Sequence, residues 1–237
     1  MNSSVDLNCD MGEGMPNDAL IMPFISSANI ACGYHAGDLY TMQQTVELAN
    51  EHHVAIGAHP SFPDKENFGR TKMNLSPSQV YDLVKAQIEL LAEIAAKNNC
   101  RMHHVKPHGA LYNMTANDRQ LAEAICQSVL STDASVFIYG LSGSLFMSIA
   151  QEMGLRPVNE VFSDRTYQKD GTLTPRDQPN ALIKDDDEVK KHVLHLMIEK
   201  NIKAESICIH GDGPSAAGLA KMINEELIQN NFIIKAP

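Results

Sequence analysis

Polar and apolar side chains alternate along several short runs that are typical of β-strands. Residues 5–10 (VDLNCD) place Asp6, Asn8 and Asp10 on one face of a strand, and residues 104–108 (HVKPH) and 208–212 (CIHGD) repeat the pattern. Helical segments separate these runs, which favours a parallel sheet covered by helices. The polar face then points away from solvent, where ionisable groups need to pair with each other, a metal or a substrate. The pattern therefore predicts an active site inside the fold.

Strand-like runs and helical segments follow each other along the whole chain. The expected strands are about 5–9, 28–33, 54–58, 103–106, 135–139, 157–161 and 206–210, with an eighth near 232–234. Helices are expected at 39–53, 77–98, 115–131, 186–200 and 214–228. This order is typical of a closed (β/α) barrel or an open doubly wound sheet, and the inward polar face favours the barrel. No linker divides the sequence, so a single domain over residues 1–237 is expected.

Composition argues against several classes of partner. The net charge is −10 and no Lys/Arg-rich run occurs, which disfavours a nucleic-acid or anionic-membrane partner. No apolar stretch approaches the roughly 20 residues of a membrane span, and no secretory signal is visible. The five cysteines form no CxxC pair, which disfavours a disulfide framework. We therefore expect a cytoplasmic protein with a small-molecule substrate, and a homo-oligomer stays open.

Histidines and acids gather where strands end. His35, His59, His108 and His210 each stand at, or just past, the carboxyl end of a predicted strand. Because these ends meet at one rim of a barrel, the four imidazoles are expected to converge. Acids accompany them in the same positions: Asp10, Glu13, Glu160, Asp164 and Asp212. Carboxylates and imidazoles together bind a divalent metal or perform acid–base catalysis.

An inward-facing lysine and two long loops add to this site. Lys106 either forms a salt bridge with Asp6, Asp10 or Glu160, or binds a phosphate or polarises a carbonyl. Loops 59–75 and 162–183 are longer than usual connections and follow strand ends, so one of them is a candidate lid. Residues 211–215 (GDGPS) could present backbone N–H groups to an anion, although they are not a P-loop.

Six sequence blocks in the same order resemble a known family. DLNCDMGEG (6–14), NIACGYHAGD (29–38), GAHPSFPD (57–64), VKPHGALYN (105–113), EVFSDRTY (160–167) and HGDGP (210–214) are similar to the LamB/YcsF family of 5-oxoprolinase A subunits. The resemblance runs from the first strand to the last helix. Departures are small: Tyr34, Asn67, Thr71 and Ser163 stand where the family often has Phe, Gly, Arg and Ala. The missing arginine at 71 weakens the attraction of that loop for anions.

The resemblance implies a seven-stranded (β/α) barrel of the glycoside hydrolase/deacetylase type. It implies ATP-dependent hydrolysis of 5-oxo-L-proline to L-glutamate, with ATP as co-substrate and subunits B and C as partners. Whether ATP binds this chain or a partner stays open. By analogy with metal-dependent polysaccharide deacetylases, a divalent metal would be held by Asp10, His35 and His59.

Roles follow from this chemistry as hypotheses. Asp10 is assigned as base or metal ligand, His108 and His210 as acid–base residues, and Lys106 as a catalytic cation. Lys106 and Arg165 would hold the substrate carboxylate or a phosphate. The remaining substrate-binding candidates are Asn8, Glu13, Arg70, Glu160, Asp164 and Asp212.

Two other functions remain alternatives. One is a metal-dependent deacetylase of an N-acetylated sugar, which the absence of Trp and the low aromatic content disfavour. The other is a non-catalytic scaffold or regulatory protein within a complex, which the inward acids and histidines disfavour.

Overall fold

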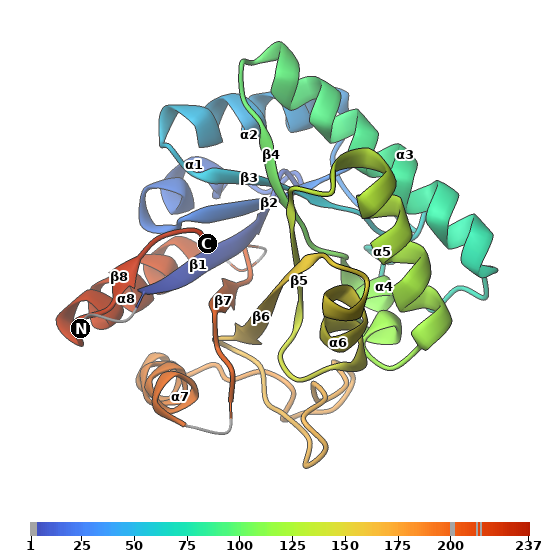
Figure 1. Cartoon of the computed structure of the whole chain (residues 1–237). Helices are drawn as coiled ribbons and strands as arrows, with labels where there is room; N and C mark the ends of the chain where they lie inside the picture. Colours follow the sequence, from blue (N-terminus) through green and yellow to red (C-terminus); the bar gives the residue numbers. More distant parts are fainter. Residues whose placement is uncertain (1–3, 200–201, 212, 214) are drawn as a thin grey trace.

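The protein is a closed barrel of seven parallel strands. The computed structural model describes residues 4–199, 202–211, 213 and 215–237. Its strands follow the order β2-β3-β4-β5-β6-β7-β1, and the pairing of β1 with β2 closes the ring (Figure 1). Their bounds are Ser4–Met11 for β1, Ser27–Ala31 for β2, Ala55–His59 for β3, Met102–Val105 for β4, Phe137–Leu141 for β5, Arg156–Phe162 for β6 and Ser206–Ile209 for β7. The predicted (β/α) barrel is confirmed.

A short eighth strand, β8 (Ile233–Ile234), pairs with the beginning of β1. It lies where the sequence predicted an eighth strand. Its pairing at Ser4 and Val5 ties the C-terminal segment to the amino-terminal end of the barrel.

Helices surround the strands on the outside of the barrel (Figure 1). None in the described part of the chain is long and apolar enough to cross a membrane. Their bounds are Asp18–Ile21 for α1, Met22–Phe24 for the 3-10 helix η1, Leu39–Glu51 for α2, Pro77–Lys97 for α3, Gly109–Thr115 for α4, Arg119–Asp133 for α5, Leu145–Glu152 for α6, Asp186–Ile198 for α7 and Ala216–Gln229 for α8.

Capping side chains fix where the predicted helices begin. Asp38 accepts a hydrogen bond from the backbone N–H of Thr41 at the start of α2, and Asp185 caps α7 in the same way. Ser76 and Gln79 form a capping box before α3. The predicted starts at 39, 77 and 186 are confirmed. Helix α8 begins at Ala216, and Pro214 lies outside the described residues.

Short helices were not predicted. The expected helix 115–131 corresponds to α5, which begins at Arg119 because Asp118 caps it, and α4, which ends at Thr115, is a separate helix that was not expected. Helices α1 and α6 were not predicted either. Helix α4 begins at Gly109, whose φ is +56°, and no side chain caps it. A seven-residue helix with neither a cap nor a long apolar period has little local signal.

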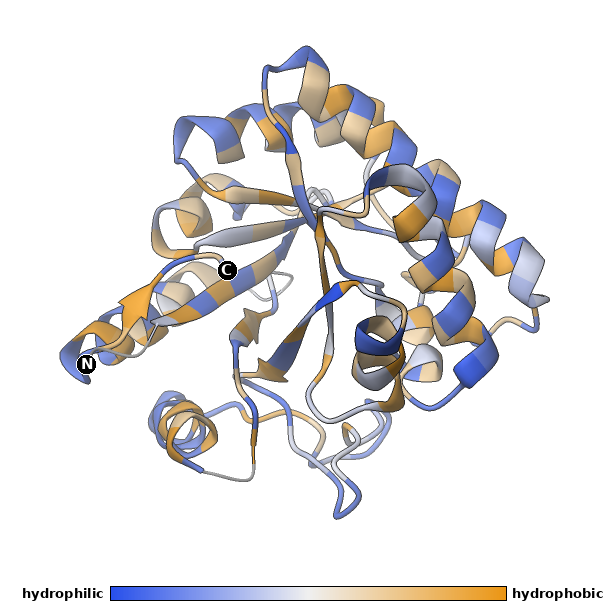
Figure 2. Cartoon of the chain, in the orientation of Figure 1, coloured by the Kyte–Doolittle hydropathy of each residue, from blue (hydrophilic) through white to orange (hydrophobic). Residues whose placement is uncertain are grey.

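Apolar residues fill the space between the strands and the helices, whereas polar residues fill the barrel. Along β1, hydrophilic and hydrophobic residues alternate (Figure 2). Leu7, Cys9 and Met11 belong to the hydrophobic core, and Asp6 and Asn8 hydrogen-bond across the interior to residues of β2, β6 and β7. The inward polar face predicted from the sequence is confirmed for this strand.

A glycine in β3 makes room for an inward histidine, which gives a stability prediction. A methyl group added at Gly57 would overlap the imidazole ring of His104, which is fully buried. We expect Gly57→Ala to lower the free energy of unfolding by about 1–3 kcal/mol or more, the usual cost of overpacking. Urea denaturation measures this change.

Gly218 provides the matched control. It lies in α8, and a methyl group there meets nothing within 4 Å. Gly218→Ala should therefore raise the free energy of unfolding by about 0.5–1 kcal/mol. Equal effects at the two glycines would contradict the proposed contact with His104.

Candidate active site

Three layers of polar side chains fill the barrel from its amino-terminal end to its carboxyl-terminal rim. In the lowest layer Asp6 accepts hydrogen bonds from the hydroxyls of Ser26, Ser27 and Ser206 at 2.6, 2.7 and 2.5 Å. Burial raises the pKa of the Asp6 carboxyl, and these hydrogen bonds only partly oppose it. This layer is a closed structural network below the site.

The raised pKa of Asp6 gives a pH prediction. An acid whose pKa is higher in the folded state adds stability below its unfolded pKa, about 3.9, and loses it as pH rises through the folded pKa. The side chain introduced by Asp6→Asn cannot titrate. We therefore compare the free energy of unfolding of Asp6→Asn with that of the wild type. As pH rises from about 3 to about 7, the difference should shift in favour of Asp6→Asn by about 1.4 kcal/mol for each unit by which folding raises the pKa of Asp6. Urea denaturation across this pH range is the test, and a pH-independent difference would contradict it.

Asparagines form the middle layer. Asn8 donates to Glu160 Oε1 at 2.9 Å, and its own oxygen accepts from Lys106 Nζ at 3.1 Å. Asn29 donates to Asp10 Oδ1 at 2.8 Å and accepts from His104 Nε2 at 2.8 Å. These amides fix the orientation of the charged groups above them.

Lys106 stands just beyond β4 and is 2% exposed. Its ammonium lies 2.9 Å from Asp10 Oδ1, 2.8 Å from Glu160 Oε1 and 3.0 Å from Cys208 Sγ. Burial lowers the pKa of Lys106, but Asp10 and the other negative neighbours outweigh burial and raise it well above its ordinary value. Both salt bridges considered from the sequence with Asp10 and Glu160 are present, so Lys106 is a buried cation held between two carboxylates.

Asp10 connects the lysine to the histidines. Its Oδ1 faces Lys106, and its Oδ2 lies 3.3 Å from His59 Nε2. Burial raises the pKa of Asp10, but its contact with His59 and the charge of Lys106 outweigh it and hold the pKa well below its usual range. Asp10 is therefore a buried carboxylate that stays ionised at the end of β1.

Three of the four selected histidines meet in a single cluster. His59 Nε2 lies 2.9 Å from His108 Nδ1, and the rings of His35 and His108 stack with centroids 3.8 Å apart. Glu13 Oε1 lies 3.1 Å from His35 Nε2. Burial lowers the pKa of His35 to about 3, and burial also lowers that of His108 well below its usual range. The predicted convergence is confirmed for these three imidazoles.

His210 approaches Asp10 from another direction. Its Nδ1 lies 2.8 Å from Asp164 Oδ1, and its Nε2 lies 2.8 Å from an Arg176 nitrogen. Asp164 therefore holds the proton on Nδ1 and leaves the lone pair of Nε2 to accept from Arg176. Burial raises the pKa of Asp164, but its contact with His210 and the charges of Arg176 and Arg165 outweigh burial and lower the pKa overall. This dyad can exchange a proton at Nε2 once Arg176 moves.

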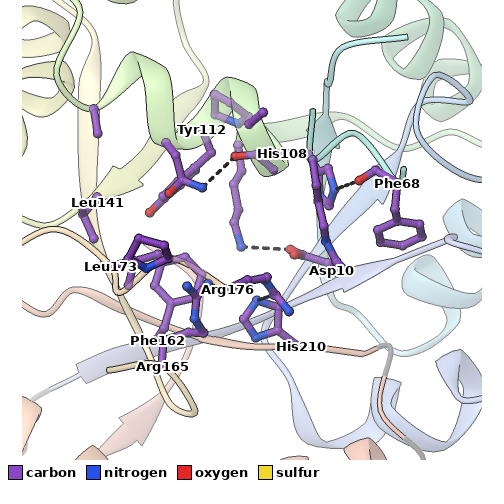
Figure 3. Close-up of a pocket in the computed structure, with 18 of the residues that line it drawn as sticks. Asp10, Phe68, His108, Tyr112, Leu141, Phe162, Arg165, Leu173, Arg176 and His210 are labelled. Carbon is purple, nitrogen blue, oxygen red and sulfur yellow. Dashed lines mark hydrogen bonds and ion pairs between the residues drawn. The ribbon is translucent and has the colours of Figure 1, made fainter. Parts of the chain in front are cut away.

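A cavity of about 560 Å³ opens above these groups (Figure 3). Figure 3 shows Asp10, His108, Phe162, Leu173, Arg176 and His210 around it. Most of the predicted site residues line it, namely Asp10, Glu13, His59, Arg70, Lys106, His108, Arg165 and His210. The volume falls within the usual range for small-molecule sites, about 300–1,000 Å³.

Other predicted residues lie behind this wall. Asn8 and Glu160 contact Lys106 from below, and Asp164 contacts His210. His35 contacts the other members of the histidine cluster. These four are not among the residues that line the cavity, so their contacts position the residues that do. Asp212 lies outside the described residues.

Two cations and a tyrosine of the cavity wall were not among the predicted site residues. Lys72 and Arg176 line the cavity beside Arg70, so anion-binding groups come from both long loops. Arg176 was visible in the loop 162–183, but only its contact with His210 distinguishes it from a surface arginine. Tyr112 lies on α4, the helix that was not predicted, and it lines the cavity as well.

Arg165 stabilises the folded conformation of the long loop after β6. Its guanidinium donates to the backbone oxygens of Thr174 at 2.6 Å and Ala181 at 3.2 Å. It is 4% exposed although it contributes to the cavity wall. The loop is therefore a folded cover over the cavity, held from inside by Arg165.

The structure divides the predicted metal ligands between two groups. His35 and His59 lie with Glu13 and His108, and their ligand atoms are all within 4.8 Å of one another. Asp10 belongs to a second group, with Cys208 and His210. Asp10 still contacts His59, but it does not share a common centre with both predicted histidines.

Known proteins match this chain over its whole length. The family model described as the LamB/YcsF family matches residues 5–237. The chain is 48% identical to the A subunit of 5-oxoprolinase from Bordetella parapertussis, with 100% of both sequences covered. It is also 48% identical to the corresponding A subunit from Tolumonas auensis, with 99% of both sequences covered.

Solved structures agree with the fold. The lactam utilization protein from Thermus thermophilus superimposes with a TM-score of 0.92 at 38% identity, covering 99% of this chain and 100% of that protein. A peptidoglycan deacetylase from Bacillus subtilis superimposes with a TM-score of 0.53 at 11% identity, covering 99% of this chain and 87% of that protein. The second likeness shows a shared barrel architecture alone. The family match and the identities over complete chains show that this protein belongs to the LamB/YcsF family.

Proposed function

We propose that this chain is the A subunit of an ATP-dependent 5-oxoprolinase, which hydrolyses the lactam of 5-oxo-L-proline to L-glutamate. Full-length relatives at 48% identity are named as the A subunit of 5-oxoprolinase, and a structural relative is named a lactam utilization protein. ATP is the co-substrate of the assembled complex, and subunits B and C are the partners.

The observation that carries this proposal is the buried pair of Lys106 and Asp10 facing the cavity. Burying two charges away from water costs free energy. A buried charged pair that faces a cavity is therefore a candidate functional site, because groups with strongly shifted pKa values cluster at active sites. The Lys106 ammonium can stabilise negative charge that develops on a carbonyl or phosphoryl oxygen. Asp10 stays ionised beside it and can orient or deprotonate water.

The reaction needs these groups because a five-membered lactam is a resonance-stabilised amide with a poor leaving group. Phosphorylation of the carbonyl oxygen by ATP makes the ring carbon electrophilic. Water then adds to that carbon and gives up a proton, the carbon–nitrogen bond breaks, and the ring nitrogen takes up a proton. The product of that step is an acyl phosphate, and a second water then hydrolyses it to glutamate and phosphate. The site must therefore remove one proton, deliver another and bind anions.

The proposed roles divide between the two sides of the cavity. Asp10 accepts the proton from water, and His210, oriented by Asp164, delivers a proton to the ring nitrogen. Lys106 stabilises charge on the reacting oxygen. Cations on the two long loops bind the substrate carboxylate or the phosphate. These cations are Arg70, Lys72, Arg165 and Arg176. Glu13, at the rim of the barrel, also contributes to substrate binding.

Reconstitution tests the proposal directly. The purified chain, its two partner subunits, ATP and 5-oxo-L-proline are mixed, and glutamate and phosphate are measured while each component is omitted in turn. We expect both products only in the complete mixture. Full activity without this chain would overturn the proposal.

The two alternative functions have their own readouts. Acetate release from an N-acetylated sugar by the isolated chain would support the deacetylase alternative. A complex that stays fully active when Asp10, His59 and Lys106 are all replaced by alanine would support a scaffold.

A further inference from the structure

The tautomers of two neighbouring histidines are set by their outer contacts. His59 Nδ1 lies 2.7 Å from the backbone oxygen of Lys106, and His108 Nε2 lies 2.9 Å from the backbone oxygen of Phe68. A carbonyl oxygen only accepts, so each of these nitrogens carries the ring proton. In neutral rings the other nitrogens, His59 Nε2 and His108 Nδ1, then present lone pairs to each other at 2.9 Å. Two facing acceptors at this distance repel unless a cation lies between or beside them.

The third histidine repeats the conflict. His35 Nδ1 lies 2.8 Å from the hydroxyl of Ser61, and that hydroxyl donates to the backbone oxygen of Phe62 at 3.0 Å. Ser61 therefore accepts the proton of Nδ1. The lone pair of His35 Nε2 then faces Glu13 Oε1 at 3.1 Å, again an acceptor against an acceptor.

From this arrangement of protons we infer that His35 Nε2, His59 Nε2, His108 Nδ1 and a Glu13 carboxylate oxygen bind one divalent transition-metal ion. The ligand atoms of these four residues lie within 4.8 Å of one another. Each imidazole is oriented by an oxygen acceptor on its far nitrogen, which is the usual second contact of metal-binding histidines. A cation would satisfy all four acceptors with a single group.

The donor set indicates the class of ion. Three imidazole nitrogens and one carboxylate suit zinc and its neighbours, whereas magnesium and calcium prefer oxygen ligands. Glu13, His59 and His108 also line the cavity, so the ion has an entry path and a side that faces substrate. The set differs from the Asp10, His35 and His59 expected from the fold analogy, because Glu13 and His108 take the place of Asp10.

Binding of the metal can be measured without turnover, so its test is independent of the proposed reaction. The full chain is treated with EDTA, dialysed, and titrated with Zn²⁺ and separately with Mg²⁺ by calorimetry. We expect one Zn²⁺ per chain and no comparable binding of Mg²⁺. Glu13→Gln and His35→Gln should each weaken Zn²⁺ binding by at least about 100-fold, more than the 10–100-fold typical of residues that only orient ligands.

Two control variants separate this site from other donors. His52→Gln removes an exposed histidine, and Cys208→Ser removes a member of the second group of ligand atoms. Both should bind Zn²⁺ as the wild type does. Loss of binding in Cys208→Ser, with binding kept in Glu13→Gln, would overturn the proposed ligand set.

A measurement on the wild type alone guards against variants that do not fold. Anomalous scattering at the zinc edge from crystals grown with Zn²⁺ should place the ion among the three histidines and Glu13. An ion at Asp10, Cys208 and His210 would overturn the proposal. So would the absence of Zn²⁺ binding together with ¹⁵N NMR spectra showing an imidazolium proton shared by His59 and His108.

Discussion

Lys106→Met is expected to destabilise the barrel by about 3–5 kcal/mol, the cost of breaking a buried ion pair by removing one partner. Lys106 is 2% exposed, and its ammonium lies 2.9 Å from Asp10 Oδ1 and 2.8 Å from Glu160 Oε1. Methionine fills a similar volume but leaves those two carboxylates without a counter-charge. Urea denaturation measures the loss.

Two controls define the electrostatic origin of this effect. Adding Glu160→Gln to Lys106→Met removes one of the stranded charges and should restore part of the lost stability. Lys97→Met removes a surface lysine that is 69% exposed and should leave stability nearly unchanged. A Lys106→Met protein as stable as the wild type would show that the buried pair contributes no net stability.

Asp10→Asn is expected to lower kcat of the reconstituted complex by about 10²–10⁴-fold, the range for losing a general acid or base. Asparagine keeps the shape of the side chain and its contact with Asn29, but it cannot take a proton from water. Lys106 keeps Glu160 as a partner, so the barrel should stay folded. Glutamate formation and circular dichroism are measured on the same preparations.

Asp6→Asn is the matched control for this prediction. Asp6 is also a buried carboxylate on the inner face of β1, but it contacts serines below the site and does not line the cavity. Its substitution should leave kcat within a few-fold of the wild type. Full activity in Asp10→Asn would refute the assigned role of Asp10, and equal losses in both variants would point to a general effect of charge removal inside the barrel.

Much of the architecture is predictable because it depends on local periodicity. The alternation at Asp6, Asn8 and Asp10 depends only on the two-residue repeat of a strand, and the structure places these residues inside the barrel. The first residues of α2, α3 and α7 were equally predictable, because a capping side chain and the first turn that it caps are neighbours in sequence. Helices α4 and α6 lack such signals and were missed.

The contacts of each site residue could not be predicted in this way, because the contacting residues come from distant parts of the chain. Which carboxylate would meet which imidazole could not be read from spacing. Glu13 reaches His35, and Asp164 lies 46 positions before its partner His210. Arg176 reaches the cavity only because the loop after β6 folds back over the barrel.

By itself the sequence indicated that ionisable side chains from separate strands share one face and end at one rim, because strand periodicity puts them on that face and right-handed β/α alternation brings the carboxyl ends of parallel strands together. Only the tertiary structure decided that Lys106 lies between Asp10 and Glu160, and that His108 and Glu13 join His35 and His59. Those contacts depend on barrel register and loop paths, which are set by packing among residues far apart in the chain.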